Sequence, residues 1–335
     1  MQTVSTDVKL PNNLYLETTS RCNLRCKGCI LYRGSWEPQR DLALKELIMI
    51  CDQLPDLERA VLHGIGEPLL NAELPNMVRY LKDRNTFVLF NSNGILLNEK
   101  WQNQLIDSGL DELRISLDAA SPAGYKAMRD SDKFNRIVSN LQAFSKRIKF
   151  HQVSHPKLSL WYLGTRENIS EIPDFIRLAA SLSVTEVYLQ RLVYFQDDEG
   201  YGLARPEKTL MDSDVALTEL IHKSHEIAKQ YGIQFNASGL SSPPDSVQTK
   251  GRNLMPWKRC YRPQTLMYIT ANGNVLPCCM APFATSDYES IILGNVFDSS
   301  LAEIWIGHRY RAFRKKRQTE QPPQCFKGCG TLWSL

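Results

Sequence analysis

The stretch LYLETTSRCNLRCKGCILYRGSW, residues 14–36, decides the fold of this 335-residue chain. Its first six residues are short and strand-like, and the loop behind them carries Cys22, Cys26 and Cys29 in the spacing C-x3-C-x2-C. Three thiolates this close together can hold three irons of a 4Fe–4S cluster and leave the fourth iron open for another ligand. A zinc site and accidental clustering are the alternatives, but structural zinc usually takes four protein ligands and a fourth is missing nearby.

Strand-like and helical segments alternate from residue 14 to about residue 236. Apolar runs that end in turn residues predict strands, and amphipathic stretches predict helices. The expected strands are LYLETT (14–19), RAVLHG (59–64), TFVLFNSNG (86–94), DELRISLD (111–118), KLSLWYLG (157–164) and VTEVYLQ (184–190), with IQFN (233–236) after the last helix. The expected helices cover 41–53, 74–84, 98–108, 121–148, 168–182 and 212–231. This order predicts an α/β fold, a partial (β/α)6 barrel of the TIM type, with its chemistry on the loops after the strands.

The alternation stops at residues 237–258, ASGLSSPPDSVQTKGRNLMPWK, which are rich in Ser, Pro and Gly. That is linker composition. We therefore expect a barrel domain over residues 1–236, a linker over 237–258 and a small domain over 259–335. The small domain holds five of the nine cysteines.

The bulk composition excludes several classes of protein. A net charge of +4, from 40 basic and 36 acidic residues, is too slight to favour nucleic acid or an anionic membrane as a partner. No run of 18 apolar residues predicts a membrane-spanning helix, and the polar N-terminus, MQTVSTDVKLPNN, is unlike a signal peptide. We expect a cytoplasmic protein, where clustered cysteines are metal ligands or redox-active thiols rather than disulfides.

The tri-cysteine loop after the first strand of an α/β domain resembles the hallmark of the radical S-adenosylmethionine (SAM) superfamily. The resemblance implies a 4Fe–4S cluster on Cys22, Cys26 and Cys29 that binds the amino and carboxylate groups of SAM. It further implies reductive cleavage of SAM to a 5′-deoxyadenosyl radical, which abstracts hydrogen from a substrate. Reduced flavodoxin or ferredoxin is the electron donor that the family implies.

Later segments resemble the family's SAM-binding motifs. Gly64-Ile65-Gly66-Glu67-Pro68 looks like the motif for the SAM amino group, with Ile65 in place of a commoner glycine. Glycines let backbone carbonyls approach the ammonium, and Glu67 adds an opposite charge. By the same resemblance, the further candidate SAM contacts after strands three to six are Ser92, Asn93, Ser116, Asp118, Arg166, Asn168, Gln190 and Arg191. Turn and helix-capping roles are the alternative for the serine, asparagine and aspartate residues.

One position departs from the family pattern. The residue before the third cysteine is often aromatic and packs near adenine, whereas here it is Gly28. Tyr32 and Trp36 are the candidates to supply that surface instead.

The C-terminal cysteines resemble the SPASM domain and its reduced version, called twitch. Cys260 is followed by twelve residues, Gly273, four residues and Cys278, and GNVFDSSLAEIW (294–305) also looks like that domain. The resemblance implies an auxiliary 4Fe–4S cluster whose four ligands are Cys260, Cys278, Cys325 and Cys329. Four cysteines could equally form a structural zinc clip, which stays open as an alternative.

Three further features each have two interpretations. Cys279, next to Cys278, is either a catalytic thiol that returns a hydrogen atom to a substrate radical or a small residue beside the cluster. His63 either faces substrate or is a structural histidine. The basic run HRYRAFRKKR (308–317) is interpreted as a solvated helix face rather than a dock for an acidic electron donor.

The main functional hypothesis is hydrogen abstraction from a carbinol C–H of a small sugar or aminocyclitol. Dehydrogenation or epimerisation would follow with help from the auxiliary cluster, because relatives with one such cluster include aminocyclitol dehydrogenases and sugar epimerases. Because the first strand is predicted to begin by residue 14, we expect no N-terminal peptide-recognition module, and this expectation favours a small-molecule substrate. A ribosomal-peptide maturase of the SPASM type, forming a crosslink or a D-residue, is the alternative, and a non-enzymatic metal scaffold is a third.

Overall fold

The computed structural model describes residues 9–195, 197–210, 215–239, 242–247 and 255–327. Their strands form one sheet in the order β10-β9-β8-β1-β2-β3-β4-β5-β6-β7. The strands are β1 (Asn13–Leu16), β2 (Arg59–Val61), β3 (Phe87–Ser92), β4 (Glu112–Ser116), β5 (Lys157–Gly164), β6 (Glu186–Arg191), β7 (Gln234–Ala237), β8 (Leu266–Ile269), β9 (Asn274–Leu276) and β10 (Gly294–Asn295).

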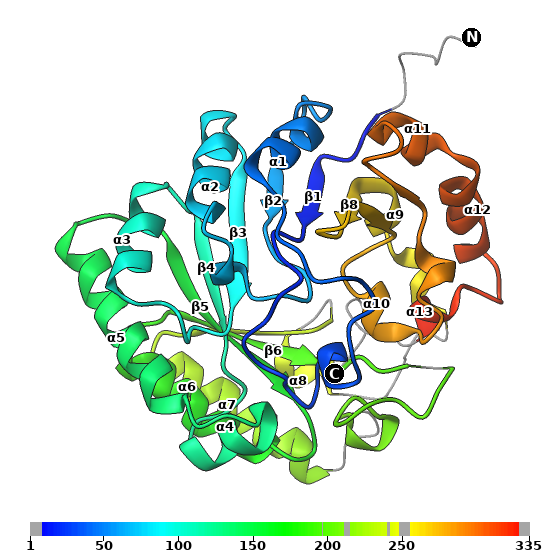
Figure 1. The fold of residues 1–335 in the computed structure, drawn as a ribbon. Helices are drawn as coiled ribbons and strands as arrows, with labels where there is room; N and C mark the ends of the chain where they lie inside the picture. The colour runs from blue at the N-terminus through cyan, green and yellow to red at the C-terminus, as the bar shows by residue number, and fades with distance from the viewer. Residues whose placement is uncertain (1–8, 196, 211–214, 240–241, 248–254, 328–335) are drawn as a thin grey trace.

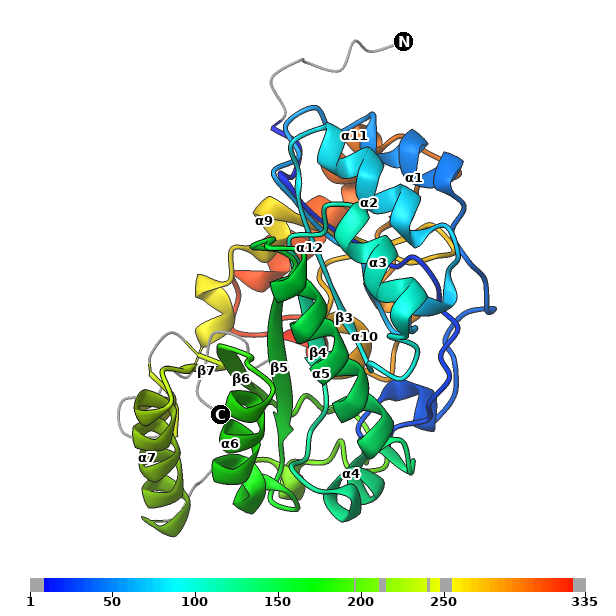
Figure 2. The same cartoon turned by 90° about the vertical axis from the view of Figure 1, so that its left-hand side faces the viewer.

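Strands β1 to β7 pair in parallel, and helices cover their outer face (Figures 1 and 2). These helices are α1 (Leu44–Cys51), α2 (Leu74–Asp83), α3 (Glu99–Asp107), α4 (Pro122–Arg129), α5 (Phe134–Phe150), α6 (Ile172–Ser181) and α7 (Val215–Gln230). The predicted α/β partial barrel is confirmed. IQFN adds β7 as a seventh parallel strand beside β6.

The two faces of β4 explain why the barrel encloses a cavity rather than a packed core. Leu113 and Ile115 are fully buried towards the helices. Because side chains alternate along a strand, Glu112, Arg114 and Ser116 share the opposite, inner face. Polar side chains there leave space that an apolar layer would fill.

The C-terminal segment extends the same sheet. β8 pairs in parallel with β1, and β9 and β10 continue as antiparallel strands. Beside them lie the short helices α9 (Arg262–Thr265), α10 (Ala281–Ala284), α11 (Leu301–Ile306), α12 (His308–Arg317) and α13 (Gln324–Lys327) (Figure 1). The sheet therefore does not stop at the proposed boundaries at 236 and 259, and the division into domains stays a prediction.

The predicted linker contains some regular structure. Ala237 ends β7, and α8 (Pro243–Ser246) packs on α7 and β7. Ser242 caps α8, and the Ser246 hydroxyl donates to the Ser238 carbonyl. In the part of the chain that the structure describes, no helix is long and apolar enough to cross a membrane.

Candidate active site

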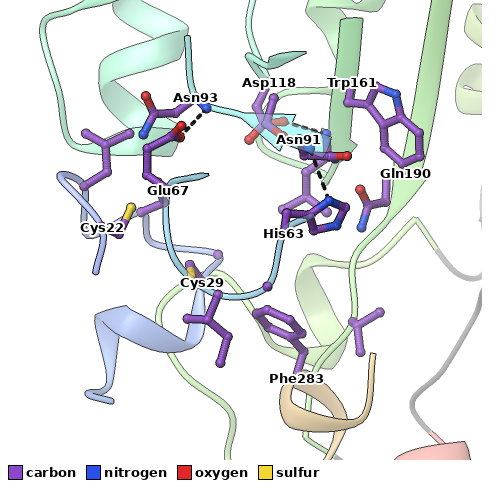
Figure 3. Close-up of a pocket in the computed structure, with 18 of the residues that line it drawn as sticks. Cys22, Cys29, His63, Glu67, Asn91, Asn93, Asp118, Trp161, Gln190 and Phe283 are labelled. Atoms are coloured by element: carbon purple, nitrogen blue, oxygen red, sulfur yellow. Dashed lines mark hydrogen bonds between the residues drawn. The ribbon is translucent and has the colours of Figure 1, made fainter. Parts of the chain in front are cut away.

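A cavity of about 250 Å³ lies at the carboxyl ends of the strands, where the barrel architecture places function. Cys22, Cys26 and Cys29 line one side of it. Figure 3 shows Cys22, Cys29 and Glu67 on one side and Trp161 and Gln190 on the other. Of the predicted SAM-site residues, the wall also includes Gly64, Gly66, Ser92, Asn93, Ser116 and Asp118.

The cysteine loop is closed by a backbone hydrogen bond, and its cysteines are buried (Cys26) or partly buried (Cys22 and Cys29). The Cys29 amide donates to the Cys26 carbonyl at 3.0 Å, closing a turn that brings the two residues together. Burial raises the pKa of the Cys22 thiol to about 11 and that of Cys29 to about 12. Such thiols stay protonated at neutral pH unless a metal replaces the proton.

The glycine motif approaches the first strand so closely that only glycine fits. A Cβ on Gly64 would lie 2.5 Å from a carboxylate oxygen of Glu17, and one on Gly66 would lie 2.0 Å from the Thr19 carbonyl oxygen. Glu17 in turn accepts hydrogen bonds from the amides of Ile65 at 2.6 Å and Gly66 at 3.3 Å. The loop is therefore anchored to the end of β1.

Glu67 ties the glycine motif to the loop after β3. Its carboxylate accepts from the Ser92 hydroxyl at 2.8 Å, the Asn93 amide at 2.7 Å and the Leu69 amide at 3.2 Å. Burial raises the pKa of Glu67. The side chain thus positions the loops as well as adding negative charge to the wall.

Asp118 forms a buried ion pair with Arg129 of α4. The guanidinium lies 2.5 Å from one Asp118 oxygen and 3.3 Å from the Cys26 sulfur. Asp118 also accepts from the Leu163 amide and has a left-handed φ of 61°. Arg129 therefore brings a positive charge to the cavity between the cysteine loop and the end of β4.

Three predicted SAM-site residues do not line the cavity. Pro68 begins a short 3-10 helix, and Arg166 lies in the turn after β5. Asn168 is buried inside that turn, where it accepts from the Thr165 amide and donates to the carbonyls of Asp118 and Leu163. Its role in the structure is to shape the turn.

Neither of the two candidates for the adenine surface lines the cavity. Gly28 lines the cavity, whereas Tyr32 is half exposed and Trp36 stacks on Tyr288, with ring centroids 5.2 Å apart. Neither ring is on the cavity wall. Phe283 of α10 is among the aromatic residues that do line it (Figure 3).

The sequence matches the radical SAM superfamily over residues 16–179 and the SPASM iron–sulfur cluster-binding domain over residues 260–330. The chain belongs to the radical SAM superfamily. Membership implies SAM and a 4Fe–4S cluster, with auxiliary iron–sulfur chemistry in the SPASM region. The assignment of individual ligands stays a prediction.

Similar proteins span nearly the whole of this radical SAM chain. The tungsten-containing aldehyde ferredoxin oxidoreductase cofactor-modifying protein of Pyrococcus furiosus is 25% identical, over 93% of this chain and 85% of its own. The PqqA peptide cyclase of Granulibacter bethesdensis is 24% identical, over 96% and 80%. The fold resembles Streptococcus suis SuiB bound to S-adenosylmethionine, with a TM-score of 0.69 and 16% identity over 96% of this chain and 72% of that one.

The cavity fits the cofactors of a radical SAM enzyme. Three thiols at one end match a cluster with one open iron. Among the described residues, no three His, Cys, Asp or Glu side chains converge on a single ion, and thiolates that bind separate irons need no such convergence. The Arg129 Nε, Asn91 Oδ1 and Tyr268 hydroxyl atoms line the wall, buried and without a hydrogen-bond partner, as expected where a polar ligand belongs.

The auxiliary cysteines lie on connected elements of the SPASM region. Cys260 precedes α9, Cys278 precedes α10, and Cys325 belongs to α13, which packs on α10. Arg317 of α12 donates to the Cys260 carbonyl, and Phe313 contacts Phe326 with ring centroids 5.2 Å apart. Cys329 lies outside the described residues, so its predicted role as the fourth ligand stays a prediction.

The adjacent cysteines Cys278 and Cys279 differ in their relation to the cavity. Cys279 lines it, whereas Cys278 does not. Arg262 contacts the Cys279 sulfur at 3.5 Å. Cys51, by contrast, is fully buried on α1. The SPASM region therefore contributes the Cys279 thiol to the same cavity that Cys22, Cys26 and Cys29 line.

Sequence reasoning missed Glu17, Asn91, Arg129 and Tyr268. Glu17 and Asn91 had a detectable signal, because each is polar within or beside an apolar strand that the sequence predicts to be buried. Arg129 and Tyr268 had none, since both reach the cavity from elements whose placement depends on the tertiary fold.

Proposed function

We propose that this radical SAM enzyme modifies a peptide, abstracting hydrogen from a C–H bond of one amino-acid residue. The observation that carries the proposal is a cavity lined by cysteines from both the barrel and the SPASM region. Its wall includes the three loop cysteines and Cys279. A substrate bound in this cavity would lie beside both the proposed SAM site and the Cys279 thiol.

When bound, the cluster and SAM would supply a carbon-centred radical, formed by reductive cleavage of SAM, which accepts the hydrogen atom from the substrate. The protein's own part is to orient SAM and the substrate and to exclude water from the cavity. Glu67 and Glu17 fix the glycine loop, and the Arg129 guanidinium offers a charge-assisted donor for a carboxylate. Epimerisation would take a hydrogen atom from Cys279, and the resulting thiyl radical would need an electron from the auxiliary cluster and a proton from solvent to restore the thiol. A crosslink would instead require the substrate radical to give an electron to that cluster and a proton to solvent.

Similar proteins favour a peptide over the sugar or aminocyclitol that the cysteine count suggested. The PqqA peptide cyclase acts on a peptide by name and aligns over 96% of this chain. SuiB, which shares the fold, has also been crystallised with its precursor peptide SuiA. These relatives support a peptide as the substrate of this enzyme.

The test is co-expression of the enzyme with each short open reading frame beside its gene, under anaerobic conditions. Mass spectrometry would detect a loss of two hydrogens for a crosslink, or deuterium uptake from D₂O for epimerisation. The expected result is a SAM-dependent change in one peptide that the Cys22/Cys26/Cys29→Ala variant does not make. Stimulation of 5′-deoxyadenosine formation by a polyol, with every peptide unchanged, would restore the small-molecule hypothesis.

A further inference from the structure

Arg129 of α4 places a buried cation against the cysteine loop. One of its two terminal nitrogens lies 3.3 Å from the Cys26 sulfur, and the other lies 2.5 Å from a carboxylate oxygen of Asp118. The Arg129 side chain is nearly buried and lines the same cavity as all three loop cysteines. The contact with Cys26 is therefore a charge-assisted N–H···S hydrogen bond to a predicted cluster ligand.

The charge of Arg129 reaches the other two cysteines of the loop. Burial raises the pKa of the Cys22 and Cys29 thiols, and Arg129 acts in the opposite direction on both, because a cation stabilises a nearby thiolate. The Glu67 carboxylate acts on Cys22 in the same direction as burial. Arg129 is thus a cation whose field covers the whole tri-cysteine loop.

Asp118 holds the guanidinium in place and partly offsets its charge. Its own side chain is nearly buried, accepts from the Leu163 amide at 2.8 Å and follows a backbone with a left-handed φ of 61°. A carboxylate fixed in this way holds the planar guanidinium in one orientation. The guanidinium contacts the Cys26 sulfur directly, so we expect its charge to outweigh that of the carboxylate at the cysteine loop.

Reduction of an iron–sulfur cluster adds one negative charge to its site. A nearby cation and hydrogen bonds to the ligand sulfurs stabilise the more negative, reduced form, and so they raise the reduction potential. A nearby carboxylate lowers the potential for the same reason. Because Cys26 is buried, solvent and salt screen these charges only weakly.

We propose that Arg129 raises the reduction potential of the cluster held by the loop cysteines, and that Asp118 is the counter-charge that limits this increase. Reduction takes one electron from an external carrier, such as reduced flavodoxin or ferredoxin, and neither forms nor breaks a bond. A higher potential makes that transfer more favourable. The inference goes beyond the proposed peptide function and does not depend on it, because the potential can be measured without a substrate.

The test is the midpoint potential from a dye-mediated titration followed by electron paramagnetic resonance, without oxygen, SAM or peptide. The relevant signal is the one that the Cys22/Cys26/Cys29→Ala variant lacks. Arg129→Met removes the charge and the N–H donors. It should lower the equilibrium constant for reduction at least about tenfold, which is a shift of about 59 mV for one electron. Asp118→Asn should raise the potential, because it leaves the guanidinium charge without its counter-charge.

The matched control is Arg25→Met, which removes an arginine from the cysteine loop itself. Arg25 is exposed, and its guanidinium donates to the carbonyls of Cys22 at 3.3 Å and Leu24 at 3.0 Å rather than to a sulfur. Solvent screens its charge, so the potential should remain close to that of the wild type. Arg129→Lys, which keeps the charge, should lie between the wild type and Arg129→Met.

A structural opening of the site cannot imitate the expected result. Water admitted beside a smaller side chain would also stabilise the more negative, reduced form, and would raise the potential. An unchanged or raised potential in Arg129→Met, or equal shifts in Arg129→Met and Arg25→Met, would overturn the inference. If Arg129→Met binds no cluster, the other two variants decide: a potential that does not rise in Asp118→Asn or does not fall in Arg129→Lys would overturn it.

Discussion

At the scale of single residues, the buried ion pair between Arg129 and Asp118 is a costly interaction to break. Both side chains are nearly buried, at 14% and 5% exposed. Removing one partner leaves an uncompensated charge in a low-dielectric site, which typically costs about 3–5 kcal/mol. Arg129→Met should therefore lower the free energy of unfolding by roughly 3 kcal/mol, as measured by anaerobic guanidinium denaturation.

The double variant Arg129→Met/Asp118→Asn is the control, because it leaves no unpaired charge and asparagine tolerates the left-handed backbone. It should recover part of the loss. A double variant as unstable as the sum of the two single ones would contradict the ion-pair explanation.

Glu17 makes stability depend on pH. Burial raises its pKa from 4.5 to about 7, so folding favours its protonated form. That contribution is present at low pH and is lost as the pH rises through 7. Between pH 6 and pH 8 the wild type should lose roughly 1 kcal/mol relative to Glu17→Gln.

The measurement is the free energy of unfolding of both proteins across that range. A difference that stays flat between pH 6 and pH 8 would show that Glu17 does not carry the titration.

Cys279 separates the two outcomes of the proposed peptide chemistry. If it returns the hydrogen atom, Cys279→Ala should abolish the epimerised product while 5′-deoxyadenosine formation continues. Cys51→Ala is the control, because that thiol is buried on α1 and does not line the cavity. Unchanged epimerisation in the Cys279 variant would rule out the donor role.

At the scale of elements, α12 is more than the solvated face that its sequence predicts. Arg314 lies 4.0 Å from the Trp305 ring centre, and Arg317 is buried and donates to the carbonyls of Lys258 and Cys260. Lys315 and other basic residues of the run are exposed, as predicted. One stretch of sequence therefore holds both structural and surface cations.

The pair Arg317→Met and Lys315→Met tests this division. The first should destabilise the SPASM region by roughly 2 kcal/mol, because two buried carbonyls lose their donor, and should reduce its retained iron. The second should change neither. Equal effects of the two changes on thermal unfolding and iron content would contradict the assignment.

The sequence predicted helices and strands well where the pattern of apolar and polar residues lies within one short segment. The strand expected at 157–164 is β5 (Lys157–Gly164), and the helix expected at 74–84 is α2 (Leu74–Asp83). β8 was not predicted, because LMYI is only four residues long and its partner β1 lies about 250 residues earlier. Pairing at that separation is a property of the whole chain and leaves no periodic signal in a short segment.

At the scale of the whole molecule, the barrel and the SPASM region share one sheet and line one cavity. β8 places Tyr268 on the cavity wall, and the Ala271 amide after it donates to Glu17, which also holds the glycine loop. The cysteine spacing and the glycine motif were readable because they are contiguous in sequence. The three-way contact through Glu17 was not, since it depends on how distant strands meet.

The most direct test of the two-site account is iron and sulfide content with electron paramagnetic resonance, measured anaerobically. The wild type is compared with the Cys22/Cys26/Cys29→Ala variant. The account predicts about eight irons per chain falling to about four, as expected for a SAM-binding cluster and one auxiliary 4Fe–4S cluster. About four irons falling to none would contradict it, because the C-terminal cysteines would then hold no iron–sulfur cluster.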